Sequence, residues 1–317
     1  MKYTDTGKKD TRSGFGQGLL EAGRADERVL ALTADLKGSL KMGAFAKEFP
    51  ERFIQCGIAE ANMVGVAAGL ALTGKVPFCG SFAEFITGRV YDQIRQEVAY
   101  GKTNVKLASS HAGITLGEDG ATHQTMEDIA LMRAIPGMTV LVPCDYNQTR
   151  QATIAAAKFE GPVYLRFGRP SVPNFTDPDE KFVIGKVYRL TEGSDVTIVC
   201  CGHTVWEALI AADTLEARGI HAEVLNAATV KPLDEKAIVE SAAKTGAVLV
   251  VEEHNMAGGL GEAVAAVLVQ HKPVPMRFIN GGDRFGQSGT PAVLMEHYGL
   301  TAANIEKEAL NLLEAGR

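Results

Sequence analysis

The sequence is poor in the features that mark membrane, secreted and nucleic-acid-binding proteins. Its 317 residues include one tryptophan, and 32 basic residues are outnumbered by 38 acidic ones. This balance gives no electrostatic reason to bind nucleic acid or an anionic membrane. No run of about 18 apolar residues occurs, and residues 1–14 lack the apolar core of a signal peptide. We therefore expect neither a membrane nor a nucleic-acid partner.

Cysteine is also scarce. The five cysteines are scattered, mostly within apolar runs, and no two form a C-x-x-C pair. An odd, scattered set is typical of buried thiols in a reducing compartment and does not suit a disulfide framework or a zinc site. These thiols predict a cytoplasmic protein.

What the sequence contains is a regular alternation of short apolar runs with longer, alanine-rich helical patterns. In the first half the predicted strands are residues 29–35, 53–57, 76–82, 105–110, 139–145 and 163–168. Near-continuous apolar strands that alternate with helices favour a parallel sheet covered on both faces. The helix that contains AEANMVGVAAGLALTG is apolar all round, which predicts a buried helix, and it ends on Gly74.

The alternation is interrupted at residues 169–186, where three prolines and a cluster of acids indicate a linker. It then resumes with predicted strands at 196–202, 222–230, 247–254 and 275–281. A chain of this length exceeds one core. We predict an α/β fold of two doubly wound domains with mainly parallel sheets. The first domain spans residues 1–172, the linker 173–188 and the second domain 189–317.

Unusual residues follow several of the predicted strands. Asp35 ends the first strand, Glu60 follows the second, and Phe82 and Phe85 follow the third. The fourth strand leads into SSHAGITLGEDGATHQTMED, residues 109–128. Because ligands of open α/β sheets bind beyond the carboxyl ends of the strands, these segments are expected to converge on one site.

Glu60 opens the apolar helix, and no lysine or arginine stands close to it in sequence. One interpretation is an acid favoured by the helix dipole and satisfied by backbone N–H groups. The other is a desolvated carboxyl that exchanges a hydrogen bond with a ring nitrogen of a ligand. Phe82 and Phe85, three residues apart, are either ordinary core aromatics or a surface on which a flat ring stacks.

The segment 109–128 packs two histidines, three glycines and four acids into twenty residues. Its glycine spacing is neither a dinucleotide fingerprint nor a Walker A motif, and its histidines do not match a zinc or EF-hand pattern. Two histidines, His111 and His123, together with Asp119 favour recognition of hydroxyl and phosphate groups. The run Gly258-Gly259-x-Gly261 is interpreted as a tight turn, with an anion nest as the alternative.

Taken together, these stretches resemble the C-terminal half of the transketolase family of thiamine diphosphate enzymes. TADLKGS is similar to a segment of that family, GIAEANMVGVAAGLAL to its catalytic-glutamate helix, and GSFAEF to its aromatic segment. HAGITLGEDGATHQ resembles its specific H-x-x-x-x-L-G-E-D-G-x-T-H-Q loop, and GPVYLRFGRP the stretch that ends in its phosphate-binding arginine. Residues 190–317, with VVEEHNMAGGLGEAV, resemble its C-terminal domain.

On the cofactor side, the resemblance implies that Glu60 hydrogen-bonds N1′ of the thiamine pyrimidine. Phe82 and Phe85 would line the pyrimidine pocket, and Asp35 would sit near the thiazolium ring. The cofactor would carry the carbanion chemistry, while the protein positions and tunes it.

On the substrate side, the resemblance implies that His111 and Asp119 meet the hydroxyls of a sugar. His123 would meet the hydroxyls or the phosphate end. Ser39 and Arg169 would bind the substrate phosphate, Arg169 through its guanidinium fork. Glu60, His111 and His123 are then the catalytic candidates.

One signature of the family is missing. The G-D-G…N segment with which its N-terminal half holds the diphosphate and a Mg²⁺ or Ca²⁺ ion does not occur in this sequence. The resemblance therefore implies a split transketolase, in which this chain works with a separate N-terminal subunit in an α2β2 assembly and the metal is bound through that partner. It would transfer a two-carbon ketol unit from a ketose phosphate to an aldose phosphate.

Three alternatives remain open. The β subunit of a 2-oxo-acid dehydrogenase shares the helix of Glu60, but a 2-oxo acid has no chain of hydroxyls for residues 111–124, the histidine loop, to bind. The C-terminal half of a deoxyxylulose-phosphate synthase is also similar, although His111 fits transketolase better. A catalytically silent interaction subunit is disfavoured by the retention of Glu60, both phenylalanines, both histidines and Arg169.

Overall fold

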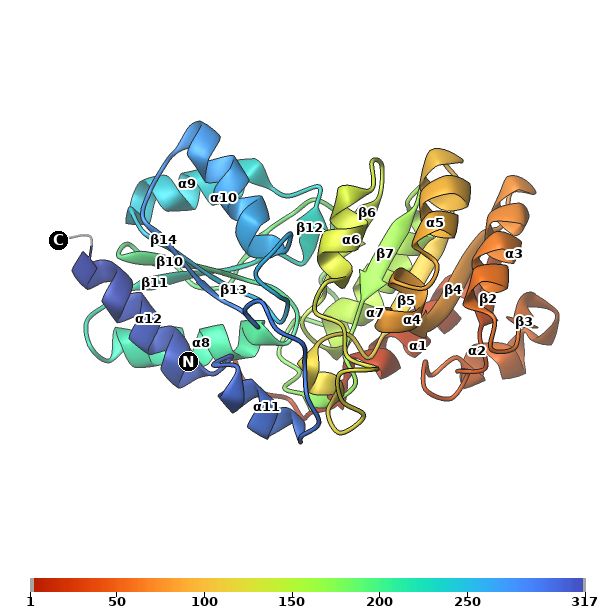
Figure 1. Cartoon of the computed structure of the whole chain (residues 1–317), viewed down its shortest axis with the longest axis horizontal. Helices are drawn as coiled ribbons and strands as arrows, with labels where there is room; N and C mark the ends of the chain where they lie inside the picture. Colours follow the sequence, from red (N-terminus) through yellow and green to blue (C-terminus); the bar gives the residue numbers. More distant parts are fainter. Residues whose placement is uncertain (1–2, 316–317) are drawn as a thin grey trace.

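A seven-stranded sheet forms the centre of the first half of the chain (Figure 1). The structure is a computed structural model that describes residues 3–315. The strand order is β12-β6-β7-β5-β4-β2-β3, with bounds Val29–Thr33 (β2), Phe53–Gln55 (β3), Val76–Phe82 (β4), Lys106–Ser110 (β5), Thr139–Leu141 (β6), Val163–Arg166 (β7) and Thr229–Lys231 (β12). β12 runs antiparallel to β6, and the other neighbouring pairs are parallel. The mainly parallel arrangement is confirmed.

Helices cover both faces of this sheet (Figure 1). Alternate residues of β2 enter two different buried clusters, Val29 and Ala31 on one face and Leu30 and Leu32 on the other. The first face is covered by α1 (Thr11–Ala25), α2 (Gly43–Glu48) and α7 (Tyr146–Lys158). The second is covered by α3 (Glu60–Leu72), α4 (Ala83–Thr87), α5 (Tyr91–Gln93), the π-helix η2 (Ile94–Tyr100) and α6 (Asp128–Ala134). Two short 3₁₀ helices are η1 (Pro50–Arg52) and η3 (Ile114–Leu116).

Helix α3 is not buried all round, so the expectation from its apolar composition is wrong. Met63 and Ala67 are fully buried, whereas Asn62 is exposed and Leu72 is 76% exposed. The helix packs one side on the sheet and turns the other to the surface of the chain. It ends at Leu72, and Gly74 takes the left-handed conformation just beyond it, at a φ of +84°.

The second half is built on a five-stranded sheet of order β14-β13-β10-β11-β9. Its strands are Tyr188–Arg189 (β9), Val196–Cys200 (β10), Ala222–Asn226 (β11), Val248–Val251 (β13) and Met276–Ile279 (β14). All neighbouring pairs are parallel except β9 with β11. Helices α8 (Thr204–Glu216) and α12 (Ala302–Ala315) cover one face and α9 (Glu235–Thr245) and α10 (Leu260–His271) the other (Figure 1). This doubly wound arrangement matches the predicted fold class.

The two halves are joined more closely than the sequence indicates. The run 222–230, expected as one strand, divides between the sheets: β11 belongs to the small sheet, and β12 pairs with β6 at the edge of the large one. Helix α11 (Pro291–His297) contacts η3 of the first half. A two-stranded ladder of β1 (Lys9–Asp10) with β8 (Ser171–Val172) brings the N-terminal segment to the start of the linker. The proposed limits 1–172, 173–188 and 189–317 stay a prediction.

Buried Asp145 fixes the linker to the first half. Its side chain caps helix α7 by accepting from Gln148 N at 2.8 Å. It also accepts from the backbone N–H groups of Phe175 and Thr176, at 2.9 and 2.8 Å. A carboxylate with several N–H donors is well compensated for its burial, which explains why an acid occupies this interior position.

Candidate functional site

The predicted site residues lie at one edge of the large sheet. Glu60 follows β3, Phe82 ends β4, His111 follows β5 and Arg169 follows β7. These strands are linked through parallel neighbours, so their carboxyl ends share an edge. The sequence-based expectation of convergence is consistent with this placement.

Four rings form a continuous aromatic surface at this edge. The ring of Phe82 stacks on that of His111, with centroids 3.8 Å apart and planes at 25°, and on that of Phe85, at 5.6 Å and 21°. His123 meets Phe85 edge-on at 5.3 Å. The structure thus brings both phenylalanines and both histidines of the predicted set together.

Glu60 is 7% exposed and opens helix α3 next to these rings. Ser81 Oγ donates to its Oε1 at 3.2 Å, and Arg89 Nη1 lies 3.9 Å from its Oε2. The guanidinium of Arg89 also lies over the ring of Phe85, 3.9 Å from the centroid. The carboxylate therefore has a cationic neighbour that the local sequence does not reveal, because Arg89 arrives from the turn after α4.

His111 is held as a neutral imidazole. Its backbone adopts a φ of +59°, a conformation that few residues other than glycine take, and its side chain is buried. Burial, together with the charges of Arg12, Arg169 and His123, lowers the pKa of His111 to about 3. Arg12 Nη1 lies 3.5 Å from Nε2, and a guanidinium can only donate, so Nε2 accepts. Nδ1 then carries the proton and donates to Ser110 Oγ at 2.8 Å.

Two arginines flank this imidazole. Arg12 Nη1 donates to the carbonyl oxygen of Ser39 at 3.3 Å, and Arg12 Nε lies 3.2 Å from Asp10 Oδ1. Arg169 Nη1 donates to the carbonyl oxygen of Leu116 at 2.7 Å. Burial, and to a smaller extent Arg169, lowers the pKa of Arg12. The two guanidinium groups are thus close enough to affect each other. They form an arginine-lined, cationic end to the site, where Arg12 is paired with Asp10 and Arg169 with Glu118, the latter at 3.1 Å.

Sequence reasoning missed Arg12. It stands at the second position of helix α1, where a positive charge is unfavourable because the helix N-terminus is itself positive. That mismatch was the available signal.

Asp35 and Asp119 contribute less to the cluster: both are exposed, and the backbone N–H of Asp35 donates to Gln55 Oε1 at 2.7 Å. His123 bonds through Nδ1 to Thr122 Oγ1 at 2.9 Å.

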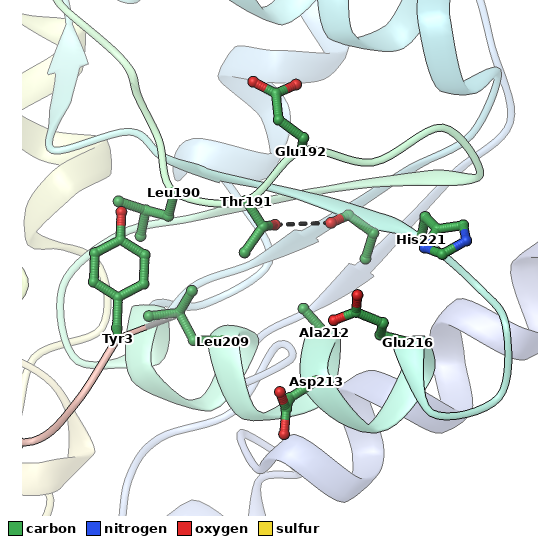
Figure 2. A pocket seen from close by; sticks show the side chains of 10 residues that line it. Tyr3, Leu190, Thr191, Glu192, Leu209, Ala212, Asp213, Glu216 and His221 are labelled. Atoms are coloured by element: carbon green, nitrogen blue, oxygen red, sulfur yellow. Dashed lines mark hydrogen bonds between the residues drawn. The ribbon is translucent and has the colours of Figure 1, made fainter. Parts of the chain in front are cut away.

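A separate cavity of about 340 Å³ is lined by the second half and by Tyr3 of the N-terminal segment, and it contains none of these residues (Figure 2). It is bordered by helix α8 and the segment after β9, where Thr191 Oγ1 donates to the carbonyl oxygen of Ala222 at 2.8 Å. The cavity does not extend the cluster at the sheet edge. Within residues 3–315, no group of three or more His, Cys, Asp or Glu side chains is placed to hold a metal ion, and no helix is long and apolar enough to cross a membrane.

Comparison with known proteins identifies the architecture. Residues 7–174 match the transketolase pyrimidine-binding domain, and residues 185–305 match the transketolase C-terminal domain. The chain belongs to the transketolase family. Its relatives include the 6-deoxy-6-sulfo-D-fructose transketolase subunit SqwH of Clostridium sp., 46% identical over 93% of this chain and 92% of the relative. Another is a subunit of the apulose-4-phosphate transketolase of Phocaeicola vulgatus, 40% identical over 96% of this chain and 97% of the relative.

A solved structure shares the whole fold. A split gene transketolase, described as an inactive beta4 tetramer, superposes with a TM-score of 0.90 at 46% sequence identity. The superposition covers 98% of this chain and all of that one. The transketolase chain described here therefore corresponds in extent to the C-terminal part of split transketolase-type enzymes.

Transketolases depend on thiamine diphosphate, and the residues of this chain fit its pyrimidine. The guanidinium of Arg89, itself flat and rich in nitrogen, lies over Phe85 and beside Glu60. The space between that ring and that carboxylate therefore admits a planar group with N–H donors, which is the character of an aminopyrimidine. The side chain of Arg89 is 53% exposed, so it can turn into solvent when another group takes this place.

Proposed function

We propose that this chain is the C-terminal subunit of a two-subunit transketolase that transfers a two-carbon ketol unit from a ketose phosphate to an aldose phosphate. The observation that carries the proposal is that two relatives named as transketolase subunits match it over more than nine-tenths of both chains. The partner would be a separate N-terminal subunit that binds the diphosphate together with Mg²⁺ or Ca²⁺. We further propose an α2β2 assembly in the cytoplasm.

When bound, thiamine diphosphate supplies the carbanion chemistry that cleaves the bond next to a ketose carbonyl. Glu60 would hold the pyrimidine through a hydrogen bond to N1′ and thereby control a proton at that atom. Phe82 and Phe85 would line the pocket of the pyrimidine ring, and Arg89 would be displaced from the face of Phe85. Asp35 would lie near the thiazolium.

The histidine loop would recognise the sugar. Nε2 of neutral His111 accepts from Arg12 in this structure and would accept from a sugar hydroxyl in place of Arg12 when substrate binds. His123, beside Phe85, and exposed Asp119 would contact further hydroxyls, His123 toward the phosphate end. In this proposal His111 and His123 also exchange protons with the reacting oxygens.

The cationic end would bind the anionic terminus of the substrate. Arg12, Arg169 and Ser39 surround the position next to His111, and two guanidinium forks match the oxygens of a phosphate. One relative is named for a sulfonated ketose and another for a phosphorylated one. A sulfonate carries a comparable fork of oxygens, so the same arginines suit either anion.

Ketol transfer from xylulose 5-phosphate to ribose 5-phosphate, with thiamine diphosphate and Mg²⁺, tests the proposal. The wild-type chain is assayed alone and with its separate N-terminal partner, and the Glu60→Gln variant is assayed with the same partner. Activity only in the wild-type mixture supports the proposal. A stable complex that turns over neither this pair nor a sulfonated ketose contradicts it, as does full activity of the chain alone.

A further inference from the structure

Three consecutive buried residues follow strand β13, and their side chains form hydrogen bonds to different halves of the molecule. Glu252, Glu253 and His254 are 1%, 3% and 0% exposed. Glu252 stays within the second half, where it accepts from the N–H groups of Leu260 at 2.7 Å and Gly261 at 2.8 Å. The glycine run before α10 is thus a helix start whose N–H donors are taken by a carboxylate of the same chain.

Glu253 reaches into the first half. Its Oε1 accepts from Thr115 N at 2.7 Å, in the middle of the histidine loop. The carboxylate lies directly on Gly113, where any Cβ would overlap it and where the backbone φ is +81°. Gly113 is therefore fixed by both its conformation and this close approach.

His203, at the start of α8, makes a second contact with Thr115. Its Nδ1 lies 3.3 Å from Thr115 Oγ1, and its ring rests on Gly168, which immediately precedes Arg169. Arg166 Nη2 donates to the backbone carbonyl of Glu253 at 2.9 Å, which fixes the segment that carries the carboxylate. These contacts are buried, so water does not compete for their hydrogen bonds.

Thr115 lies between the two histidines of the proposed site. On its far side, Gln124 closes the loop by donating to the carbonyl oxygens of Ile114 and Gly117, at 3.1 Å each. It also donates to the carbonyl oxygen of Gln287 of the second half, at 3.0 Å. Because the loop is held both at Thr115 and at Gln124, its segments are coupled, and a displacement at Thr115 is transmitted to His111 and His123.

We infer that Glu253 of the second half is a positioning residue for the histidine loop, which it holds by the hydrogen bond to Thr115 N in the place where His111 and His123 meet substrate. The inference rests on the proposed function for its effect on substrate, and on the contacts above for the loop itself. Glu253 acts through the loop and does not touch the sugar.

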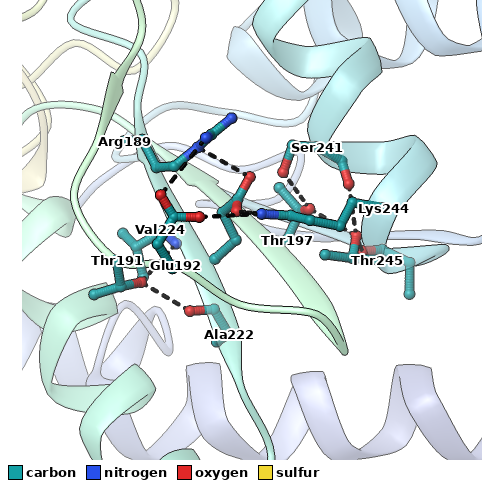
Figure 3. Close-up of polar contacts among 11 residues, drawn as sticks. Arg189, Thr191, Glu192, Thr197, Ala222, Val224, Ser241, Lys244 and Thr245 are labelled. Atoms are coloured by element: carbon teal, nitrogen blue, oxygen red, sulfur yellow. Dashed lines mark hydrogen bonds and ion pairs between the residues drawn. The ribbon is translucent and has the colours of Figure 1, made fainter.

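The test uses three variants of the full chain in complex with the N-terminal subunit. Glu253→Ala removes the acceptor of Thr115 N, whereas Glu253→Gln keeps an oxygen of the same shape. Glu223→Ala is the matched control, since Glu223 is also a fully buried carboxylate of the second half, paired with Arg189 at 3.3 Å and with Lys244. That polar cluster is formed by side chains around β9, β11 and α9 (Figure 3), and residues 111–124 are not among its members.

Hydrogen–deuterium exchange of peptides within 111–124 and steady-state kinetics are measured for each variant. In Glu253→Ala we expect exchange at Thr115 to rise about tenfold or more and KM for the ketose phosphate to rise about tenfold, because one buried hydrogen bond is lost. Affinity for thiamine diphosphate is unchanged. In Glu253→Gln the exchange at Thr115 and the KM for the ketose phosphate both return toward wild type, and Glu223→Ala changes neither quantity.

Unchanged loop exchange in Glu253→Ala overturns the inference, as does an equal change in Glu223→Ala, which would show general loss of stability. A faster-exchanging loop with unchanged KM also overturns it. If the wild-type complex lacks ketol transfer, the proposed function fails, and the exchange measurements still decide whether Glu253 holds the loop.

Discussion

The neutral state of His111 has a consequence for stability that can be measured without any ligand. Burial, together with the neighbouring side chains of Arg12, Arg169 and His123, lowers the pKa of its imidazole from the ordinary 6.5 to about 3. In the unfolded chain the same group binds a proton below pH 6.5. Between these pKa values the unfolded state holds more protons, so the free energy of unfolding falls as the pH falls. The stabilisation is complete above pH 6.5 and is lost progressively toward pH 3.

The size of this effect at pH 5 follows from the difference between the solution pH and the unfolded pKa. A gap of about 1.5 pH units corresponds to about 2 kcal/mol of unfolding free energy, at 1.36 kcal/mol per unit. The perturbation is His111→Asn, because asparagine tolerates the left-handed backbone of this position. Urea denaturation at pH 5.0 and pH 7.5 gives the change in unfolding free energy for each protein.

We expect wild type to lose about 2 kcal/mol more than His111→Asn between pH 7.5 and pH 5.0. The comparison cancels the general cost of the substitution, since each protein is referred to its own value at pH 7.5. His221→Asn, at an exposed position of the second half, is the control and should follow wild type. Parallel pH dependences for wild type and His111→Asn would refute the reasoning.

Three further predictions concern the assembled enzyme. Glu60→Gln should lower kcat by a factor of about 10² to 10⁴, the range for loss of a positioned proton-transfer group, as measured by ketol transfer; a near-wild-type rate contradicts the role. Arg89→Ala should leave thiamine diphosphate binding equal or tighter by calorimetry, because the guanidinium no longer occupies the face of Phe85; a markedly weaker cofactor affinity opposes this. Arg12→Ala and Arg169→Ala should each raise KM about tenfold for a ketose phosphate, through loss of charge-assisted hydrogen bonds. KM for an unphosphorylated ketose should stay the same, and a parallel rise there would indicate general disruption.

Much of the fold could be predicted because several buried strands, such as β2 (VLALT) and β13 (VLVV), are almost entirely apolar. Both strands are buried at every residue, and such runs leave little ambiguity about position. The run 222–230 shows the limit of this signal. Ala227 and Ala228 are fully buried between β11 and β12, so hydrophobicity does not change where the chain leaves one sheet for the other.

The candidate site could be predicted only as far as its residues lie at strand ends. The histidine loop and Glu60 are found this way, since topology alone places them at a common edge. The pairing of Arg89 with Glu60 could not be predicted, because it depends on how the turn after α4 folds back. Likewise, Glu252 and Glu253 are adjacent acids at the end of one strand, and no pattern indicates that one caps α10 while the other crosses to Thr115.

The pairing of β12 with β6 determines how this protein can be divided for experiments. Strand β12 comes from the C-terminal sequence but completes the edge of the N-terminal sheet, and Lys231 Nζ anchors it to the carbonyl oxygens of Arg133 and Ile135 at 2.7 and 2.6 Å. A fragment cut at the linker would present β6 with unpaired backbone groups, a template for edge-to-edge aggregation. Recombinant fragments of the first half therefore need a supplied β12 segment, and a cut chain is a natural system for fragment complementation.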